Sequence, residues 1–255
     1  MGLFDKKSCD ICGGKIGMLG NRKLDDGNCC KECAKQLSPF FSERRKSTVA
    51  DIKAQLDYRE KNKAAVAAFN PTRTLGIVTR VYLDEDKGKF AVSDSARFGT
   101  DNPDILDFSQ VTGCNVEVQE SSRELKQKGP DGKDVSYNPR RYSYSFSFYI
   151  VIHVNSPWFN EIKFLLTKSI EIESTEVRSS LSGSTGLGMR SNEYRQAEIL
   201  GNEIKTALTQ VRQGVRDNIA AANAPKTAQN CPLCGATCIP NEQGCCEFCG
   251  GAMLA

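Results

Sequence analysis

The feature of this sequence that most constrains its fold is an unbroken alternation from Arg141 to Val154. Every second side chain in this run is apolar or aromatic, and serines fill the first positions between them. The alternating set is Tyr142, Tyr144, Phe146, Phe148, Ile150, Ile152 and Val154. A two-residue period over this length predicts a long β-strand with one buried face. The chain is therefore expected to build a domain around this strand.

Shorter strand patterns lie on both sides of this run, and no helical pattern separates them. The predicted strands are Leu75–Leu83, Phe90–Ser93, Ile105–Phe108, Val111–Val118 and Glu161–Leu166, with Ile170 and Ile172 extending the last. Residues 120–140 are polar and rich in turn formers, which indicates a loop or a hairpin tip. Closely spaced strands without helices between them favour an antiparallel sheet that curls or closes into a barrel.

Two helices are predicted outside the strand region. The first spans residues 38–69, because Ser38-Pro39 is a typical helix start and Asn70-Pro71 a typical stop. The second spans residues 192–222, and its apolar residues repeat at spacings of three and four. This stripe consists of Ala197, Leu200, Ile204, Leu208, Val211, Val215 and Ile219. We expect it to pack on the open end of the sheet rather than on a second copy of the chain.

Cysteine pairs near the N-terminus have the spacing of a metal site. Cys9 and Cys12 form one CxxC motif, Cys30 and Cys33 form a second, and 17 residues lie between the motifs. This spacing is typical of a four-cysteine zinc site, in which each motif turns two sulfurs toward one ion. Cys29 is an alternative ligand, but we prefer Cys30 because it completes the second motif.

A second pair of motifs near the C-terminus predicts a compact zinc ribbon. Its expected ligands are Cys231, Cys234, Cys246 and Cys249, with 11 residues between the motifs. Cys238 and Cys245 are then surplus thiols within this cluster. Cys114 is the one cysteine outside the two clusters, and its strand-like surroundings favour a small buried side chain.

The clustered cysteines point to metal rather than to disulfides, since disulfides are rare in a reducing compartment. We therefore predict two structural Zn²⁺ ions in a cytoplasmic protein. Four thiolates around one Zn²⁺ carry a net charge of −2, so two filled sites lower the formal charge from +3 to about −1. A strong overall attraction to nucleic acid is not expected. The sequence has neither a membrane-spanning apolar run nor a signal peptide.

Together these patterns predict an α+β chain with a zinc ribbon at each end. The expected divisions are a first ribbon at 1–36, a connecting helix at 37–70, a central β-rich domain with its C-terminal helix at 71–222, a linker at 223–230 and a second ribbon at 231–255. Within the central domain, residues 179–191 are small and polar, which predicts a flexible loop.

The residues CDICGGKIG and KLDDGNCCKEC resemble the short zinc-ribbon domain of bacterial proteins of unknown function. The resemblance continues through FNPTRTLG, DNPDILDFSQVTGC and VSYNPRRYSY, and so covers most of the chain. The C-terminal CPLCG and CCEFCGG are similar to the ribbon that ends many bacterial multi-domain proteins. Strands followed by one long helix resemble a pleckstrin-homology-like barrel. The resemblance implies the same eight cysteine ligands and no particular activity.

These observations favour a non-catalytic scaffold or adaptor over an enzyme. His153 is the only histidine, and no serine or cysteine nucleophile motif accompanies it. The central domain is expected to bind a protein, a peptide or a lipid headgroup through a groove or an exposed sheet edge.

The sequence also allows two alternative functions. Nucleic-acid binding would use Arg22-Lys23, Arg44-Arg45-Lys46 and Arg140-Arg141, but residues 225–255 hold one lysine and two glutamates. A thiol redox protein would use one CxxC at a helix start in a βαβ unit. Paired motifs at ribbon spacing argue against that function.

Overall fold

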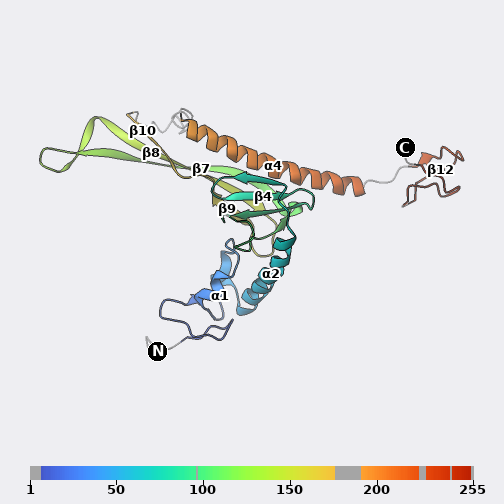
Figure 1. Cartoon of the computed structure of the whole chain (residues 1–255), viewed down its shortest axis with the longest axis horizontal. Helices are drawn as coiled ribbons and strands as arrows, with labels where there is room; N and C mark the ends of the chain where they lie inside the picture. The colour runs from blue at the N-terminus through green and yellow to red at the C-terminus, as the bar shows by residue number, and fades with distance from the viewer. Residues whose placement is uncertain (1–6, 96, 176–190, 224–227, 242, 254–255) are drawn as a thin grey trace. The chain divides into compact units, whose positions relative to one another are not determined.

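The computed structural model describes residues 7–95, 97–175, 191–223, 228–241 and 243–253. It divides into two compact units, Met1–Gln213 and Gly214–Ala255 (Figure 1). Most of the loop predicted at 179–191 lies outside the described residues, as does the middle of the predicted linker at 224–227. In the described part of the chain, no helix has both the length and the apolar character needed to cross a membrane.

The central domain contains two antiparallel sheets of four strands each. The first, in the order β3-β4-β5-β6, comprises β3 (Arg73–Gly76), β4 (Arg80–Asp84), β5 (Lys89–Ser93) and β6 (Leu106–Asp107). The second is built on β8 and comprises β7 (Val111–Lys128), β8 (Asp134–Val154), β9 (Glu161–Leu165) and β10 (Ile170–Ser174). The α+β class with antiparallel strands is confirmed, but the predicted closure into a barrel is wrong for the described strands.

A short 3-10 helix, η2 (Phe108–Gln110), separates the two sheets along the chain. Asp107 and Gln110 form a capping box around it, in which Asp107 N donates a hydrogen bond to Gln110 Oε1 at 2.9 Å. The ladder of the first sheet ends at this helix, so β7 pairs with β8 and not with β6. The two sheets therefore remain separate in the described part of the chain.

β8 has the buried face that its alternation predicts. The buried side chains of this face are Tyr144, Phe146, Phe148, Ile150, Ile152 and Val154. One edge of β8 pairs with β7, and the other edge pairs with β9 and then with β10. Three strands therefore depend on its register, because a slip of one residue would turn the aromatic side chains to the opposite face.

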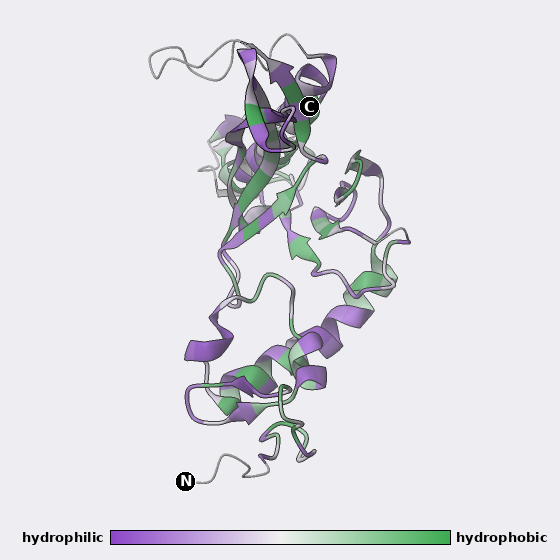
Figure 2. Cartoon of the chain, turned by 90° about the vertical axis from the view of Figure 1, so that its left-hand side faces the viewer, coloured by the Kyte–Doolittle hydropathy of each residue, from purple (hydrophilic) through white to green (hydrophobic). Residues whose placement is uncertain are grey.

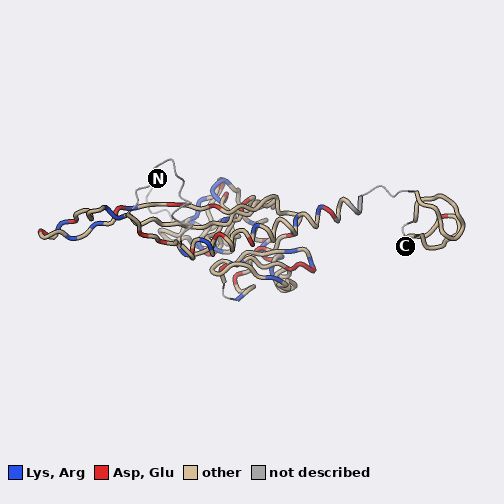
Figure 3. The backbone as a smooth tube through the Cα atoms, turned by 90° about the horizontal axis from the view of Figure 1, so that it is seen from above, with Lys and Arg blue, Asp and Glu red and all other residues tan. Residues whose placement is uncertain are grey.

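β7 and β8 continue beyond the other strands as a two-stranded hairpin, so most of residues 120–140 is strand rather than loop. Pairing continues to Lys128 and Asp134, whose side chains form an ion pair at 2.7 Å. Arg140 and Glu124 approach to 3.8 Å across the strands. Charges of both signs follow one another along this hairpin (Figure 3). Polar cross-strand pairs hold it in the absence of apolar alternation.

The stretch predicted as one strand at Leu75–Leu83 is instead a hairpin of β3 and β4. Gly76 begins the turn with a φ of +99°, a conformation that glycine adopts without strain. A Cβ atom at this position would overlap the carbonyl oxygen of Thr79. The turn was missed because Ile77 and Val78 are strong strand formers, yet both are exposed here.

The first part of the apolar stripe of α4 (Asn192–Asn223), from Ala197 to Leu208, packs on the second sheet as predicted (Figure 1). The last residue of the predicted stripe, Ile219, is exposed. Tyr194 meets the rings of Phe146 and Phe148 edge-on, with centroid separations of 5.2 and 4.9 Å. Gly201 lies directly against Val116 of β7. The buried residues of this helix are Tyr194, Ala197, Gly201, Ile204, Ala207 and Leu208.

The N-terminal part of the first unit contains a small hairpin and three helical segments. They are β1 (Arg22–Lys23), β2 (Asn28–Cys29), α1 (Lys31–Lys35), η1 (Glu43–Lys46) and α2 (Val49–Ala68). The helix predicted at residues 38–69 therefore begins later, at Val49. Thr48 and Asp51 form a capping box that fixes this start, because each side chain accepts a hydrogen bond from the other's backbone N–H.

The middle of α2 buries polar side chains, on a helix that is mostly hydrophilic (Figure 2). Arg59 Nη1 donates to Asp104 Oδ1 at 2.9 Å, and both side chains are buried. Ser38 Oγ donates to the other carboxylate oxygen of Asp104 at 2.7 Å. Asn62 Nδ2 donates to Pro103 O at 2.7 Å. These hydrogen bonds form a polar junction between α2 and the segment that precedes β6.

Replacing Asp104 by alanine tests this junction. We expect Asp104→Ala to lower the free energy of unfolding by about 3–5 kcal/mol, because Arg59 would remain buried without a counter-charge. Urea denaturation followed by circular dichroism measures the change. Lys63→Ala is the control, since it removes an exposed pair with Glu60 that is worth at most about 1 kcal/mol. Equal effects of both substitutions would contradict the assignment.

Gly201 offers a second test, of the contact between α4 and the second sheet. A Cβ at Gly201 would lie 3.1 Å from both methyl groups of Val116, whereas nothing lies within 4 Å of one at Gly214. We expect Gly201→Leu to destabilise the fold by about 1–3 kcal/mol through overpacking. Gly214→Leu should be neutral or stabilising, because leucine favours the helix. Thermal unfolding of both variants provides the comparison.

Candidate metal centres

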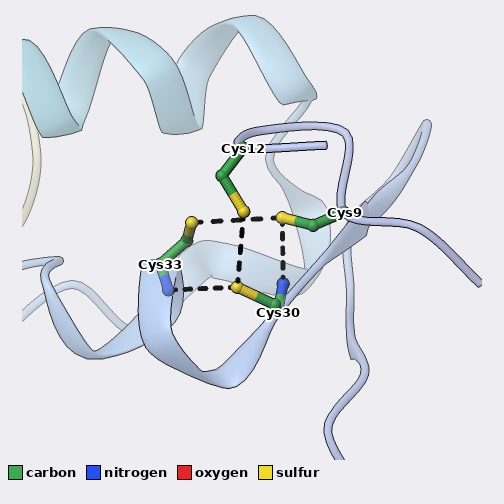
Figure 4. Close-up of side chains that lie close together, drawn as sticks. All are labelled: Cys9, Cys12, Cys30 and Cys33. Atoms are coloured by element: carbon green, nitrogen blue, oxygen red, sulfur yellow. Dashed lines mark hydrogen bonds between the residues drawn. The ribbon is translucent and has the colours of Figure 1, made fainter. Parts of the chain in front are cut away.

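Four cysteine side chains from two segments meet in the N-terminal part of the first unit (Figure 4). This part, residues 7–68, is called the N-terminal unit below. The sulfurs of Cys9 and Cys33 lie 4.0 Å apart, and those of Cys12 and Cys30 lie 3.9 Å apart. Sulfurs bound at about 2.3 Å to one tetrahedral Zn²⁺ are separated by about 3.8 Å. A disulfide would instead join two sulfurs at about 2.05 Å. The observed contacts link one CxxC motif to the other, which is the arrangement of a shared metal site.

The first motif is a tight turn that ends on a glycine. Gly13 N donates a hydrogen bond to Cys9 O at 2.8 Å, and Cys9 N donates to Gly14 O at 2.8 Å. Gly13 has a φ of +72°, which glycine adopts without a steric cost. This turn directs the sulfurs of Cys9 and Cys12 toward the same point (Figure 4).

The second CxxC motif lies at the start of a helix and does not form a glycine turn like that of the first motif. Cys30 is the N-cap of α1, and its sulfur accepts a hydrogen bond from Cys33 N at 3.3 Å. Residues three apart at a helix start lie on the same side, so both sulfurs can reach one ion. The N-terminal centre therefore combines one glycine turn with one helix end.

Backbone N–H groups favour the thiolate form of Cys9. Burial raises the pKa of this thiol, but hydrogen bonds from the N–H groups of Cys12, Cys30 and Ile11 outweigh burial and lower the pKa to about 6. The hydrogen bond from Cys30 N to the Cys9 sulfur measures 3.2 Å. Because metals bind the thiolate, Cys9 is already suited to coordinate an ion at neutral pH.

The second unit uses the glycine turn twice. Gly235 N donates to Cys231 O at 2.9 Å, and Gly250 N donates to Cys246 O at 2.9 Å. The two glycines have φ values of +70° and +71°, close to that of Gly13. A small antiparallel hairpin of β11 (Gln229–Asn230) and β12 (Thr237–Cys238) accompanies the first turn. This pair of similar turns matches the ribbon predicted from the sequence.

The sulfurs of the second unit converge in the same way. Cys231 and Cys249 approach to 3.5 Å, and Cys234 and Cys246 approach to 3.7 Å. The backbone N–H of Cys249 contributes most to lowering the pKa of Cys246, which falls to about 6 although burial acts in the opposite direction. The N–H of Cys234 likewise lowers the pKa of Cys231.

Both clusters fit a tetrahedral metal with soft ligands. In each one, four sulfur atoms lie within 4.8 Å of one another. Four thiolates at this distance would repel one another without a cation between them, and tetrahedral sets of sulfur ligands bind zinc or iron. The structure thus brings together all eight cysteines predicted as ligands: Cys9, Cys12, Cys30 and Cys33 in the first cluster, and Cys231, Cys234, Cys246 and Cys249 in the second.

The cysteines beside the expected ligands lie outside the clusters. Cys29 is buried and directs its sulfur toward Cys30 O at 3.4 Å. Burial, followed by the nearby thiols, raises the pKa of Cys29 to about 11. The sulfur of Cys245 lies 3.7 Å from Gln243 O. The structure places Cys30 and Cys246 in the clusters and leaves Cys29 and Cys245 out, in agreement with the preference that the CxxC spacing gave.

Cys238 has a different position, which the sequence did not indicate. Its sulfur lies 3.5 Å from that of Cys246 and 3.4 Å from that of Met253. Together with Cys231 these residues form the buried apolar cluster of the second unit. Cys238 is therefore a buried core residue that packs against one of the expected metal ligands, Cys246. Such a core is too small to hold a fold without further support, which a bound metal would supply.

The remaining residues singled out in the sequence lie elsewhere. His153 is half-buried and lies beside Gly113 of β7. Cys114 is buried opposite Ile152, as expected for a small core residue, and burial raises its pKa to about 11. Two basic pairs that are distant in the sequence, Arg22-Lys23 and Arg44-Arg45, line one cleft in the N-terminal unit.

Comparison with known proteins gives a match that covers the segment containing the first metal centre. A family model described as a domain of unknown function, DUF4428, matches residues 7–55. The matched segment contains the first four-cysteine cluster and the start of α2, so the N-terminal part of the predicted resemblance is supported. No curated protein and no solved structure matches the chain. The resemblance beyond residue 55 stays a prediction.

Adjacent cysteines provide a matched test of the ligands. In protein loaded with zinc, we expect Cys30→Ser and Cys246→Ser each to reduce the metal content from two ions per chain to one. Cys29→Ser and Cys245→Ser should retain both ions, because neither sulfur belongs to the four that gather in its cluster. Elemental analysis of the purified variants gives the count. Loss of zinc from Cys29→Ser with retention in Cys30→Ser would reverse the assignment.

Proposed function

We propose that this chain is a non-catalytic scaffold or adaptor whose terminal units fold around zinc. The closed ligand set of each cluster carries this proposal, because four sulfurs complete the tetrahedral shell of one ion. A catalytic zinc site instead keeps one position for water or substrate. The geometry therefore supports metal that stabilises structure rather than metal that takes part in a reaction.

Within this proposal, the central domain binds a peptide or protein segment. A groove of about 550 Å³ lies between the start of α4 and the segment that links β9 to β10. Ile77, Ile170 and Leu200 line it with apolar surface, and Lys168 and Glu193 add charges of both signs. Its volume falls within the range of about 300–1,000 Å³ that is usual for ligand sites. An extended peptide with an apolar anchor and flanking charges would complement this lining.

The proposal includes a distant likeness of the central domain to the pleckstrin-homology fold. Its support is the order of elements, in which the strands come first and one long helix, α4, follows and packs on a sheet. Folds of this kind bind diverse partners, so the site rather than the fold decides the ligand. The mixed lining of the groove favours a peptide over a lipid headgroup, which would need a predominantly basic pocket.

A thiol redox function has less support. Cys30 and Cys33 do stand at a helix start, as a redox CxxC requires, but α1 is only five residues long. The short sulfur contacts join one motif to the other in both units. A redox pair would need its two sulfurs to approach each other within one motif.

Selection from a displayed peptide library tests the groove. The zinc-loaded full chain is used as bait, and the selected peptides are measured against variants by fluorescence polarisation. We expect Ile170→Glu to weaken binding by about tenfold or more, as loss of a central apolar contact usually does. Ile199→Glu is the matched control, because Ile199 lies on α4 but is exposed and outside the groove lining.

Two results would contradict the peptide-binding proposal. One is that no peptide is enriched over selection against an unrelated bait. The other is that Ile199→Glu and Ile170→Glu weaken binding equally, which would place the contact outside the groove. Zinc analysis of each variant shows whether the terminal units remain folded.

A further inference from the structure

Two of the most exposed large hydrophobic side chains among the described residues are neighbours in one turn of the N-terminal unit. Met18 is 92% exposed and Leu19 is 90% exposed, compared with 73% for Leu233. Gly17 and Gly20 flank them, and Gly20 N donates to Gly17 O at 2.9 Å, which closes the turn. Exposing two adjacent apolar side chains to water is unfavourable unless they have a partner.

A basic cleft of about 610 Å³ begins directly after this turn. Its lining residues are Asn21, Arg22, Lys23, Leu24, Asp25, Arg44 and Arg45. Arg44 Nη1 donates to Lys23 O at 2.9 Å, and this hydrogen bond holds η1 against β1. Four of the seven lining residues are cationic, and Asp25 is the only acidic one. Two basic pairs that lie 20 residues apart in the sequence thus form one positively charged surface.

These cations are available to an anion. Among the described residues, none of Arg22, Lys23, Arg44 and Arg45 forms an ion pair with a carboxylate. Burial lowers the pKa of Arg44, and the charges of Arg22 and Arg45 lower it further against the opposing effect of Cys29. A bound anion would relieve this repulsion. Each guanidinium has five N–H donors, and the hydrogen bonds to described residues use one of the Arg22 nitrogens and one of the Arg44 nitrogens.

Arg22 connects the turn to the cleft. Its Nη1 donates to Leu19 O at 3.2 Å and to Asn21 O at 3.3 Å. The apolar turn and the cationic cleft are therefore held next to each other. Proteins that bind the surface of a membrane combine these two features, since apolar side chains enter the lipid interface while Lys and Arg bind anionic headgroups.

We propose that the N-terminal unit docks on an anionic lipid surface. Met18 and Leu19 enter the interface between headgroups and acyl chains, and the cleft receives headgroup phosphates. This site uses none of the residues that line the groove of the central domain, so it stands or falls independently of peptide binding. It also gives the segment matched by the domain of unknown function, residues 7–55, a role beyond holding metal.

Nucleic-acid binding and charge compensation would each account for only part of this surface. A nucleic acid would use the cations, but the cleft lining contains no aromatic side chain on which bases could stack, and the apolar turn would have no role. Charge compensation would use the cations only to offset the adjacent thiolates, since Cys29 acts on the pKa of Arg44. Each of these two roles predicts a measurable outcome that differs from that of lipid docking.

Vesicle flotation of the zinc-loaded full chain tests the proposal. We expect the protein to float with vesicles of phosphatidylcholine and phosphatidylglycerol but not with phosphatidylcholine alone, and added salt should weaken the interaction. The double variant Met18→Ser/Leu19→Ser should have an affinity for these vesicles that is lower by about tenfold or more. The double variant Lys23→Glu/Arg45→Glu should show a loss at least as large.

Matched variants control for general changes of hydrophobicity and charge. Ile199→Ser removes an exposed apolar side chain on α4, and Lys31→Glu/Lys53→Glu makes the same charge change outside the cleft. Both should bind within a few-fold of the original protein. Equal losses in test and control variants would overturn the proposal, as would absence of flotation with phosphatidylglycerol.

Two further results would assign the cleft to another role and overturn lipid docking. One is loss of zinc from Lys23→Glu/Arg45→Glu, which would show that the cations only balance the metal centre. The other is tight binding of a fluorescent single-stranded oligonucleotide that needs Lys23 and Arg45 but not Met18 and Leu19. Zinc analysis and fluorescence polarisation provide these two measurements.

A substitution that adds apolar surface gives an independent readout. Met18→Trp should bind phosphatidylglycerol vesicles more tightly, because tryptophan prefers the membrane interface. Its fluorescence emission should shift to shorter wavelength on binding, measured against the background of Trp158, the only native tryptophan. Tighter binding without an emission shift would show that the turn does not enter the lipid, and would contradict the proposal.

Discussion

The burial of one face of β8 is the constraint on which most of the first unit depends. This strand pairs with β7 along one edge and with β9 and β10 along the other, and its aromatic side chains contact α4. A slip of one residue in β8 would expose these side chains and break all four contacts. The long hairpin of β7 and β8 and the position of α4 therefore follow from the same alternation of apolar and polar residues.

The two ends of the chain meet a different constraint, since each has too few apolar residues to form a stable core. Each end brings four sulfurs within 4.8 Å of one another, the arrangement in which four thiolates bind one metal ion. Glycine turns and a helix end achieve this with different local structures. The shared geometry supports the proposal that metal stabilises both units and leaves binding to the surfaces they help to form.

The polar junction between α2 and the segment before β6 joins the first metal centre to the central domain. Apolar residues at the start of α2, Val49 and Ile52, pack against the core of that centre, and Arg59 and Asn62 make buried hydrogen bonds farther along the helix. Buried polar contacts fix one arrangement more strictly than apolar ones, because a shifted partner leaves a donor or a charge unpaired. The turn and cleft proposed to bind lipid therefore lie in the same compact unit, Met1–Gln213, as the proposed peptide groove.

Local patterns of amino acids were enough to predict the features that repeat at short range. The period of β8, the stripe of α4 and the spacing of the CxxC motifs are local patterns, and strand, helix and the meeting of eight cysteines follow from them. The start of α2 was missed although its capping box, Thr48 to Asp51, is also local, because Ser38-Pro39 offered a competing start. Other features became visible only in the folded chain. They are the two separate sheets on either side of η2, the pairing of Arg59 with Asp104, the contact of Cys238 with the second centre, and the meeting of β1 and η1 in one cationic cleft. The Arg59–Asp104 pair and the β1–η1 cleft join residues that are distant along the chain, and no periodicity or spacing records such a contact.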